Sequence, residues 1–176
     1  MSDISNAEIA ERLQKLQDIE EIKCLKHAYF RCIDTVDMEG LSQIMDENVR
    51  TCYVGGTYRI ELQDRTQFLE MIANSFHNEA IARHNGHHPE IEILSETEAS
   101  GIWYLHDVFI DLRSMVRTEG TALYHDRYRK VGGHWRIKEQ TYERIYEIVE
   151  TLEVRPECTV HLLATKGREL PQNKPK

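Results

Sequence analysis

The hydrophobic period of the chain changes near residue 81, and this change limits the fold more than any other feature of the sequence. Before it, outside one short hairpin segment, apolar residues recur at three- and four-residue steps, as on an amphipathic helix. After it, apolar and polar residues alternate, as in strands with one buried face. Helices followed by a run of long strands are typical of the α+β class. We therefore predict N-terminal helices packed on a curved, mostly antiparallel sheet.

Three helices are expected in the first part, over residues 6–33, 38–46 and 65–76. Each follows a side chain suited to accept hydrogen bonds at a helix start, namely Ser5 or Asn6, Asp37, and Asp64. The first helix presents one apolar face, formed by Ile9, Leu13, Leu16, Ile19, Ile22, Leu25 and Tyr29. A break near residues 17–18 stays open, because Asp18 followed by Glu21 is itself a capping-box pattern.

The expected strands form a short hairpin and four longer strands. Residues 49–54 and 57–61 are joined by Gly55-Gly56, which is a hairpin signal. The longer strands are predicted at 81–96, 99–112, 119–131 and 134–149, with Gly132-Gly133 as the turn between the last two. Their content of Trp, Tyr, Ile and Val suits a strongly bent antiparallel sheet.

The length of 176 residues fits one domain, which we place at residues 1–150, followed by a partly flexible extension over 151–176. A chain of this size can bury roughly 70% of its unfolded surface, so it needs no disulfide or metal to fold. Within the extension, we interpret residues 151–167 as a strand or a lid and 168–176 as a frayed end.

Charge and cysteine content exclude several classes of protein. A net charge of −8 disfavours a nucleic-acid partner, which requires a basic face. No apolar run is long enough to span a membrane, and the N-terminus lacks the features of a signal peptide. The cysteines, Cys24, Cys32, Cys52 and Cys158, show no C-x-x-C pair or zinc-like spacing, so we expect reduced, mostly buried thiols in a cytoplasmic protein.

Residues 83–89, Arg-His-Asn-Gly-His-His-Pro, hold three of the nine histidines. Histidine gains and loses a proton near neutral pH, which suits a general base that removes an acidified C–H proton. His84 is our candidate for this base, and the alternative is a loop-to-strand histidine that faces solvent. No metal site is expected, because an extended segment turns His87 and His88 to opposite faces.

An acidic residue near the end of the first helix supports this interpretation. Asp34 lies where the helix dipole disfavours a carboxylate, which indicates that another group requires it. It is our candidate for accepting the second imidazole N–H of His84 and fixing the tautomer. The alternative is a cap for the next helix, for which Asp37 is better placed.

Asp107 is a carboxylate on an otherwise apolar strand face, which it shares with Trp103, Leu105 and Phe109. Such a carboxylate is costly unless it is paired or used. His106 faces the other way and is expected at the surface or in an interface.

Arg144 presents a conflict in the last strand. Strict alternation places it on one face with Tyr142 but also with Arg136 and Lys138, which cannot all line an apolar pocket. A β-bulge near 139–141 would resolve this conflict, and without one Arg144 is exposed.

Five short segments carry a family resemblance. They are Ile19-Glu-Glu-Ile-Lys-Cys-Leu-Lys, Tyr29-Phe-Arg-Cys-Ile-Asp34, His84-Asn-Gly-His-His-Pro-Glu-Ile, Gly101-Ile-Trp-Tyr-Leu-His-Asp107 and Tyr142-Glu-Arg-Ile-Tyr146. In order and spacing they resemble the bile-acid 7α-dehydratases, in the SnoaL-like branch of the nuclear transport factor 2-like superfamily, over residues 18–150. Scytalone dehydratase and hexachlorocyclohexane dehydrochlorinase are similar more distantly, through the Asp/His pair. Residues 111–119 depart from the bile-acid enzymes in length and lack their tyrosine, which favours a different substrate.

The resemblance implies a cone-shaped α+β barrel around a deep apolar pocket. It implies that His84 is the catalytic base and that Asp34 orients it. Tyr29 would hold the departing hydroxyl or the substrate oxygen. Asp107 and Arg144 would belong to the same catalytic pocket, with Arg144 gating its mouth or binding a substrate acid group.

We assign Tyr53, Trp103 and His87 to substrate binding, with Tyr53 as a second hydroxyl donor. The resemblance further implies that no cofactor is needed and that the protein is a homotrimer packed through the outer sheet face.

These assignments predict a cofactor-independent dehydratase for an apolar fused-ring hydroxy-carbonyl compound, such as a hydroxysteroid or a bile acid. The base would form an enolate that expels hydroxide, with a tyrosine donating a proton. Two alternatives stay open, because this fold hosts many functions. One is a non-catalytic ligand-binding or structural subunit, and the other is an isomerase or dehydrochlorinase that uses the same base.

Overall fold

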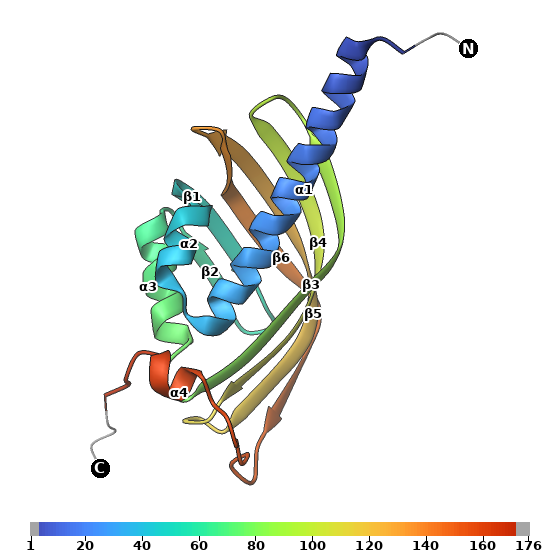
Figure 1. The fold of residues 1–176 in the computed structure, drawn as a ribbon. Coiled ribbons are helices and arrows are strands. Elements are labelled where there is room, and N and C mark those ends of the chain that lie inside the picture. The colour runs from blue at the N-terminus through green and yellow to red at the C-terminus, as the bar shows by residue number, and fades with distance from the viewer. Residues whose placement is uncertain (1–3, 172–176) are drawn as a thin grey trace.

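The computed structural model describes residues 4–171, which fold as helices on the inner side of one curved sheet (Figure 1). The helices are α1 (Asn6–Thr35), α2 (Met38–Ile44), α3 (Arg65–Ser75) and the short α4 (Leu163–Lys166). The strands are β1 (Met45–Val54), β2 (Arg59–Leu62), β3 (Ala80–Ile93), β4 (Glu98–Asp111), β5 (Val116–Val131) and β6 (His134–Thr151). This is the predicted α+β class, in the form of an unclosed cone.

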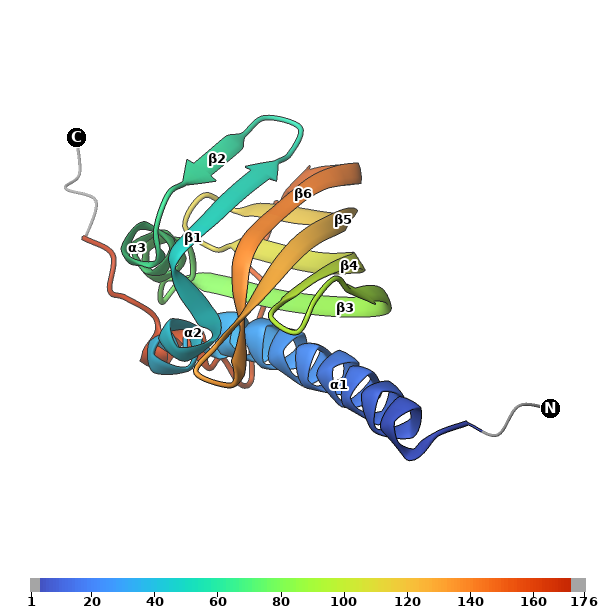
Figure 2. The same ribbon diagram turned by 90° about the horizontal axis from the view of Figure 1, so that it is seen from above.

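The sheet has the strand order β2-β1-β6-β5-β4-β3. Every neighbouring pair is antiparallel except β1 with β6, which is parallel. Viewed from above, α1 runs along β3 while α3 lies beside β1 (Figure 2). The space between these helices and the curved sheet contains the core and the pocket described below.

α1 is continuous, and its start is capped as predicted. The Ser5 hydroxyl accepts a hydrogen bond from the backbone N–H of Glu8 (3.2 Å), and the Glu8 carboxylate accepts one from the backbone N–H of Ser5 (2.8 Å). The break left open near residues 17–18 does not form. Asp18 is instead buried, where it accepts hydrogen bonds from the Trp135 indole N–H (3.0 Å) and from the Lys130 ammonium.

The apolar face predicted for α1 is buried only in its second half. Ile22 and Tyr29 belong to the core, but Ile9, Leu13 and Leu16 are 52, 64 and 64% exposed. The reason is geometric, because the N-terminal half of α1 extends past the edge of the sheet (Figure 1). Periodicity predicts which side of a helix is apolar, but not how far the neighbouring sheet reaches.

The core contains a fully buried ion pair that the sequence analysis missed. Lys26 of α1 and Asp126 of β5 have no exposed side-chain surface, and Lys26 Nζ lies 2.7 Å from Asp126 Oδ2. The ammonium also lies 3.8 Å from the ring centre of Tyr124, and Tyr128 donates a hydrogen bond of 2.7 Å to the same carboxylate oxygen. Burial lowers the pKa of Lys26, and the charge of Asp126 opposes that shift. The pair fixes α1 against the centre of the sheet.

Two β-bulges decide which side chains of β6 face inward. In the pairing of β5 with β6, Lys138 and Ile145 of β6 have no partner residue on β5, so each marks a bulge. The bulge at Lys138 is the one expected near 139–141. It shifts the buried series of β6 by one residue, so Gln140 is fully buried and the Arg144 side chain is only 9% exposed.

The C-terminal segment packs back against α3 and the start of β3. Among its described residues no strand follows Thr151, and α4 buries Leu163 instead. Arg155 donates a hydrogen bond to the Leu112 carbonyl (3.1 Å). Arg168 pairs with Glu70 of α3 (2.7 Å). The remainder of the predicted frayed end, residues 172–176, lies outside the described part of the chain.

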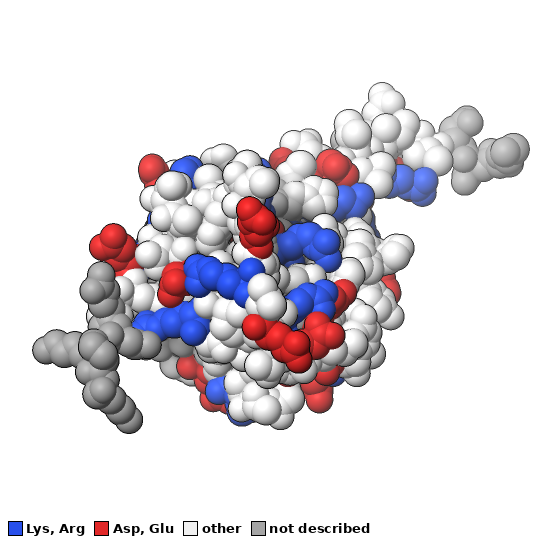
Figure 3. All heavy atoms as spheres, turned by 90° about the horizontal axis from the view of Figure 1, so that it is seen from below, with Lys and Arg blue, Asp and Glu red and all other residues white. Residues whose placement is uncertain are grey.

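Basic and acidic side chains are interspersed on the face seen from below (Figure 3). Within residues 4–171, none of the helices has the length and apolar character needed to cross a membrane. The cysteines are free as expected, but they are not mostly buried: Cys32 is buried, Cys52 is partly exposed, and Cys24 and Cys158 are exposed.

Replacing Lys26 with Met is expected to lower the free energy of unfolding by about 3–5 kcal/mol, because Asp126 then stays buried as a charge without its partner. Combining Lys26→Met with Asp126→Asn removes both charges and keeps an acceptor for Tyr128, so it should recover at least half of the loss. Urea unfolding followed by circular dichroism measures both, with Lys23→Met, at a solvent-accessible position of the same helix, as the control. A double variant no more stable than Lys26→Met would contradict the coupling.

Candidate active site

A pocket of about 260 Å³ lies between α1, α3 and the inner face of the sheet. Its wall is mostly aromatic and aliphatic, with Ile33, Ile72 and Phe109 among the contributors. Polar groups enter it from His84, the tyrosine hydroxyls and a group of charged side chains on β4 and β6. A larger hollow of about 520 Å³ lies on the outer side of the sheet, over exposed residues such as His125, and contains none of the candidate site residues.

His84 and Asp34 form a hydrogen-bonded pair at the pocket wall. His84 Nδ1 lies 2.6 Å from Asp34 Oδ1, and the His84 backbone N–H donates to Asp34 Oδ2 at 3.0 Å. Because a carboxylate accepts at Nδ1, the neutral ring carries its proton there, and Nε2 is left to accept a proton. The two side chains are 11% and 25% exposed. This is the arrangement of an oriented general base.

Asp34 occupies the unfavourable position that the sequence predicted. It lies in the last turn of α1, which ends at Thr35 and is followed by Val36 in the left-handed conformation (φ 51°). That turn contains no basic side chain, so the helix dipole disfavours the carboxylate. The two N–H groups of His84 supply the hydrogen bonds that hold it there.

Two phenylalanine rings hold the His84 imidazole in place. Phe30 stacks on it with ring centres 6.4 Å apart and an interplanar angle of 15°, and Phe76 approaches to 5.7 Å. Phe30 reaches this position only because β3 has a glycine beneath its ring. A Cβ at Gly86 would lie 1.9 Å from Phe30 Cε2.

A cluster of tyrosine hydroxyls provides hydrogen-bond donors in the pocket. The Tyr29 and Tyr53 oxygens are 3.4 Å apart, and Tyr53 donates to Gln140 Oε1 at 2.5 Å. Burial raises the pKa values of Tyr29 and Tyr53 well above the ordinary tyrosine value. Both hydroxyls therefore stay protonated and act as donors rather than bases.

Asp107 and Arg144 form a buried ion pair across β5. Arg144 Nη2 donates to Asp107 Oδ2 (2.9 Å) and Nη1 donates to Oδ1. Gly120 lies between them on β5, and a Cβ there would be 3.1 Å from Arg144 Nη1. Burial alone would lower the pKa of Arg144, but the hydrogen bonds and charge of Asp107 outweigh it and raise the pKa. The expected role of binding a substrate acid group is not supported, because the guanidinium already has acidic partners.

The second acidic partner of Arg144 is Glu147, which the sequence analysis missed. Arg144 Nε lies 3.2 Å from Glu147 Oε1, and the Glu147 side chain is 9% exposed. Glu147 Oε2 accepts a hydrogen bond from the backbone N–H of Gly56 in the first hairpin (3.2 Å). The bulge at Ile145 turns Glu147 inward, and no composition or spacing signal indicates a bulge there.

Six of the predicted site residues converge. Tyr29, Tyr53, His84, Asp107 and Arg144 line the pocket, and Asp34 binds His84. Tyr124, whose ring lies edge-on 6.2 Å from Tyr29, joins them. Its alternation with the buried Ala122 and Asp126 could have revealed it.

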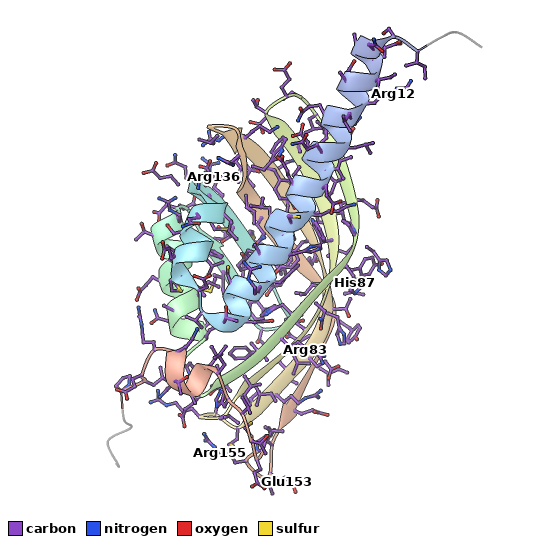
Figure 4. All side chains as sticks on the ribbon, viewed as in Figure 1. Arg12, Arg83, His87, Arg136, Glu153 and Arg155 are labelled. Atoms are coloured by element: carbon purple, nitrogen blue, oxygen red, sulfur yellow. The ribbon has the colours of Figure 1, made fainter. Side chains whose placement is uncertain are left out.

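Trp103 and His87 lie apart from the pocket, which corrects their assignment to substrate binding. Trp103 is 1% exposed and donates its indole N–H to the Tyr128 hydroxyl (2.9 Å), so it fills the core. His87 stacks on Tyr104 (5.6 Å) at the outer side of β3 (Figure 4). His87 follows His84 by three positions along β3, and an odd spacing along a strand places two side chains on opposite faces.

Metal ligation finds no support in residues 4–171, where no cluster of three or more His, Cys, Asp or Glu side chains could hold an ion. The described pocket contains an oriented imidazole, neutral hydroxyl donors and paired charges.

Changing Gly120 to Ala is expected to lower the free energy of unfolding by about 1–3 kcal/mol, because overpacking forces backbone movement. The added Cβ would lie 2.6 Å from the Tyr146 carbonyl oxygen as well as against Arg144. Urea unfolding measures the loss. Thr121→Ala, at the next position of the same strand, is the control and should have the smaller effect. If Gly120→Ala and Thr121→Ala lowered the free energy of unfolding equally, the close crossing of Arg144 over Gly120 would be contradicted.

Comparison with known proteins places this geometry in a family. The model of a SnoaL-like domain matches residues 14–141. Among solved structures, a type 2 hexachlorocyclohexane dehydrochlorinase (LinA) is similar with a TM-score of 0.72 and 15% identity, over 84% of this chain and 98% of that one. A LinA-type3 dehydrochlorinase from Novosphingobium barchaimii has a TM-score of 0.69 and 16% identity, over 82% and 99%. A putative scytalone dehydratase from Novosphingobium aromaticivorans has a TM-score of 0.66 and 18% identity, over 92% and 98%. The chain belongs to the SnoaL-like domain family, with the nuclear transport factor 2-like fold.

Proposed function

We propose that this protein is a cofactor-independent lyase that eliminates water from an apolar ring compound carrying a hydroxyl group β to a carbonyl. The observation that carries the proposal is the Asp34–His84 pair at the wall of an apolar pocket. The Nδ1 and the backbone N–H of His84 are both bound to the Asp34 carboxylate. The names of the similar structures, dehydrochlorinase and dehydratase, both denote eliminations.

The reaction begins when His84 Nε2 takes a proton from the carbon next to the substrate carbonyl. Negative charge then develops on the carbonyl oxygen, where the protonated Tyr29 hydroxyl donates a hydrogen bond, with Tyr53 beside it. A fixed donor at the site of developing charge is the largest single contribution in many enzymes. The enolate expels the β-hydroxyl, a carbon–carbon double bond forms, and the proton from carbon leaves with the hydroxide as water.

The substrate is apolar and cyclic in this proposal. Ligand pockets for drug-sized molecules measure roughly 300–1,000 Å³, so a cavity of about 260 Å³ encloses a small ring system or one end of a larger one. A hydroxysteroid or bile acid would insert its reacting end and leave the remainder at the mouth.

We further propose a homotrimer packed through the outer sheet face. Exposed apolar side chains on β6 support an interface there, namely Tyr146 and Ile148, which pair with Thr121 and Glu119 of β5. Light scattering during gel filtration would measure the mass, and a monomer would refute this part.

Replacing His84 with Ala should abolish turnover, because the proton acceptor is lost. The assay incubates a panel of hydroxylated 3-oxo-steroids and bicyclic β-hydroxy-ketones with the protein and detects loss of one water molecule by mass spectrometry. His134→Ala, an exposed histidine at the start of β6 and outside the pocket, is the matched control and should keep wild-type turnover. Binding of a panel member without turnover by the wild type would favour the non-catalytic subunit. Loss of a halide or a shift of a double bond would favour the dehydrochlorinase or isomerase.

Changing Tyr29 to Phe should lower kcat by about 10²–10³, because one donor to the developing oxyanion is removed. KM should change little, since the ring that packs in the pocket is kept. Tyr104→Phe removes a hydroxyl from an exposed tyrosine and serves as the control. A kcat within about twofold of the wild type in Tyr29→Phe would remove that hydroxyl from the mechanism.

A further inference from the structure

Three charged side chains, Asp107, Arg144 and Glu147, contact one another at the pocket wall. Both Nη atoms of Arg144 donate to Asp107. Its Nε lies 3.2 Å from Glu147 Oε1, an ion-pair distance at which neither of these two atoms makes a hydrogen bond. The three side chains are only 6–9% exposed. A ligand carboxylate, which binds arginine through two N–H donors, would have to displace Asp107 or approach beside Glu147.

Glu147 is fixed in this group from two directions. Its Oε1 faces Arg144, while its Oε2 accepts the Gly56 backbone N–H from the hairpin of β1 and β2. The inward turn of Glu147 comes from the bulge at Ile145, which sets it opposite Gly120 in the register of β5 and β6. Rotation of Glu147 away from Arg144 would break the contact with the hairpin.

The wall of the pocket consequently carries excess negative charge. Asp107 and Glu147 together contribute two negative charges against the single positive charge of Arg144, which is the only Lys or Arg among the described lining residues. Asp34 adds a further carboxylate behind His84. Lys26, beneath the tyrosines, is already neutralised by Asp126. An anion that enters meets like charges at low dielectric, where repulsion is strong.

We propose that the pocket accepts ligands whose enclosed part is uncharged and rejects carboxylates, and that Glu147 is the residue that determines this selectivity by placing its negative charge beside Arg144. This inference rests on the proposed function only in treating the pocket as the substrate site. The ligand class is an uncharged ring system bearing a carbonyl or hydroxyl oxygen, with any acid group of the substrate outside the pocket.

The test compares two probes of equal shape, 2-naphthamide and 2-naphthoate, by calorimetric titration at neutral pH. The wild type should bind the amide at least about tenfold more tightly than the carboxylate. Glu147→Gln keeps the size of the side chain but removes its charge. It should raise the affinity for naphthoate at least about tenfold and leave the affinity for the amide within about threefold. Glu143→Gln, exposed on the same strand, is the control and should leave both affinities unchanged.

Naphthoate binding as tight as amide binding in the wild type would overturn the proposal. The proposal would also be overturned if Glu147→Gln left the ratio of the amide and carboxylate affinities unchanged, or if the amide failed to bind the wild type. If Glu147→Gln does not fold, Asp107→Asn removes a carboxylate from the other side of Arg144 and should shift the ratio in the same direction. Equilibrium binding uses no turnover, so the wild-type comparison of the two probes tests the selectivity even if the protein proves not to be a lyase.

Discussion

The two hydrogen bonds that His84 donates to Asp34 are the contact on which the pocket depends. They join the last turn of α1 to β3, set the imidazole tautomer, and hold a carboxylate where the helix dipole disfavours it. Two further charged contacts fasten the same helix to the sheet, at Asp18 and at Lys26. The three residues are spaced by eight positions, so each lies about 80° further around the helix than the one before it. α1 thus positions the base through a series of charged contacts as well as through apolar packing.

The charged groups of the pocket form a row across four strands. His84 pairs with Asp107, Asp107 with Gly120, and Gly120 with Glu147 in the strand register. The glycine leaves room for Arg144 to cross β5 and bind the acids on both sides. Arg144 thus contacts two acids of the protein itself, which is the basis of the proposed preference for uncharged ligands.

Local signals in the sequence predicted the elements and singled out Asp34 as a partner for His84. The change of period predicted helices before strands, and Ser5, Asp37 and Asp64 cap the helices as expected. Asp34 was identifiable because a carboxylate at a helix C-terminus contradicts the local electrostatics. The helix periodicity, the caps and the unfavourable position of Asp34 depend only on residues close together in the sequence, so the sequence alone predicts them.

The contacts that escaped prediction depend on distant segments. Lys26 interrupts an apolar stripe, and only the position of Asp126 on β5 explains its burial. Glu147 faces inward because of a bulge that no residue type announces. Trp103 shares the predicted face with Asp107, but the pocket ends before it reaches that level of the core. The side of a helix or strand on which a residue lies follows from the local sequence. How deeply that residue is buried, and which residue it pairs with on the next strand, depend on the whole sheet.

The most direct test of the proposed base is the protonation site of the His84 ring, measured by proton–nitrogen correlation spectroscopy of the histidine side chains and assigned with His84→Ala. Neutral His84 is expected to carry its proton on Nδ1, bound to Asp34, with Nε2 unprotonated. Asp34→Asn should disturb this preference. A neutral His84 with its proton on Nε2 in the wild type would rule out His84 as the base, because the nitrogen needed to accept the substrate proton would already be occupied.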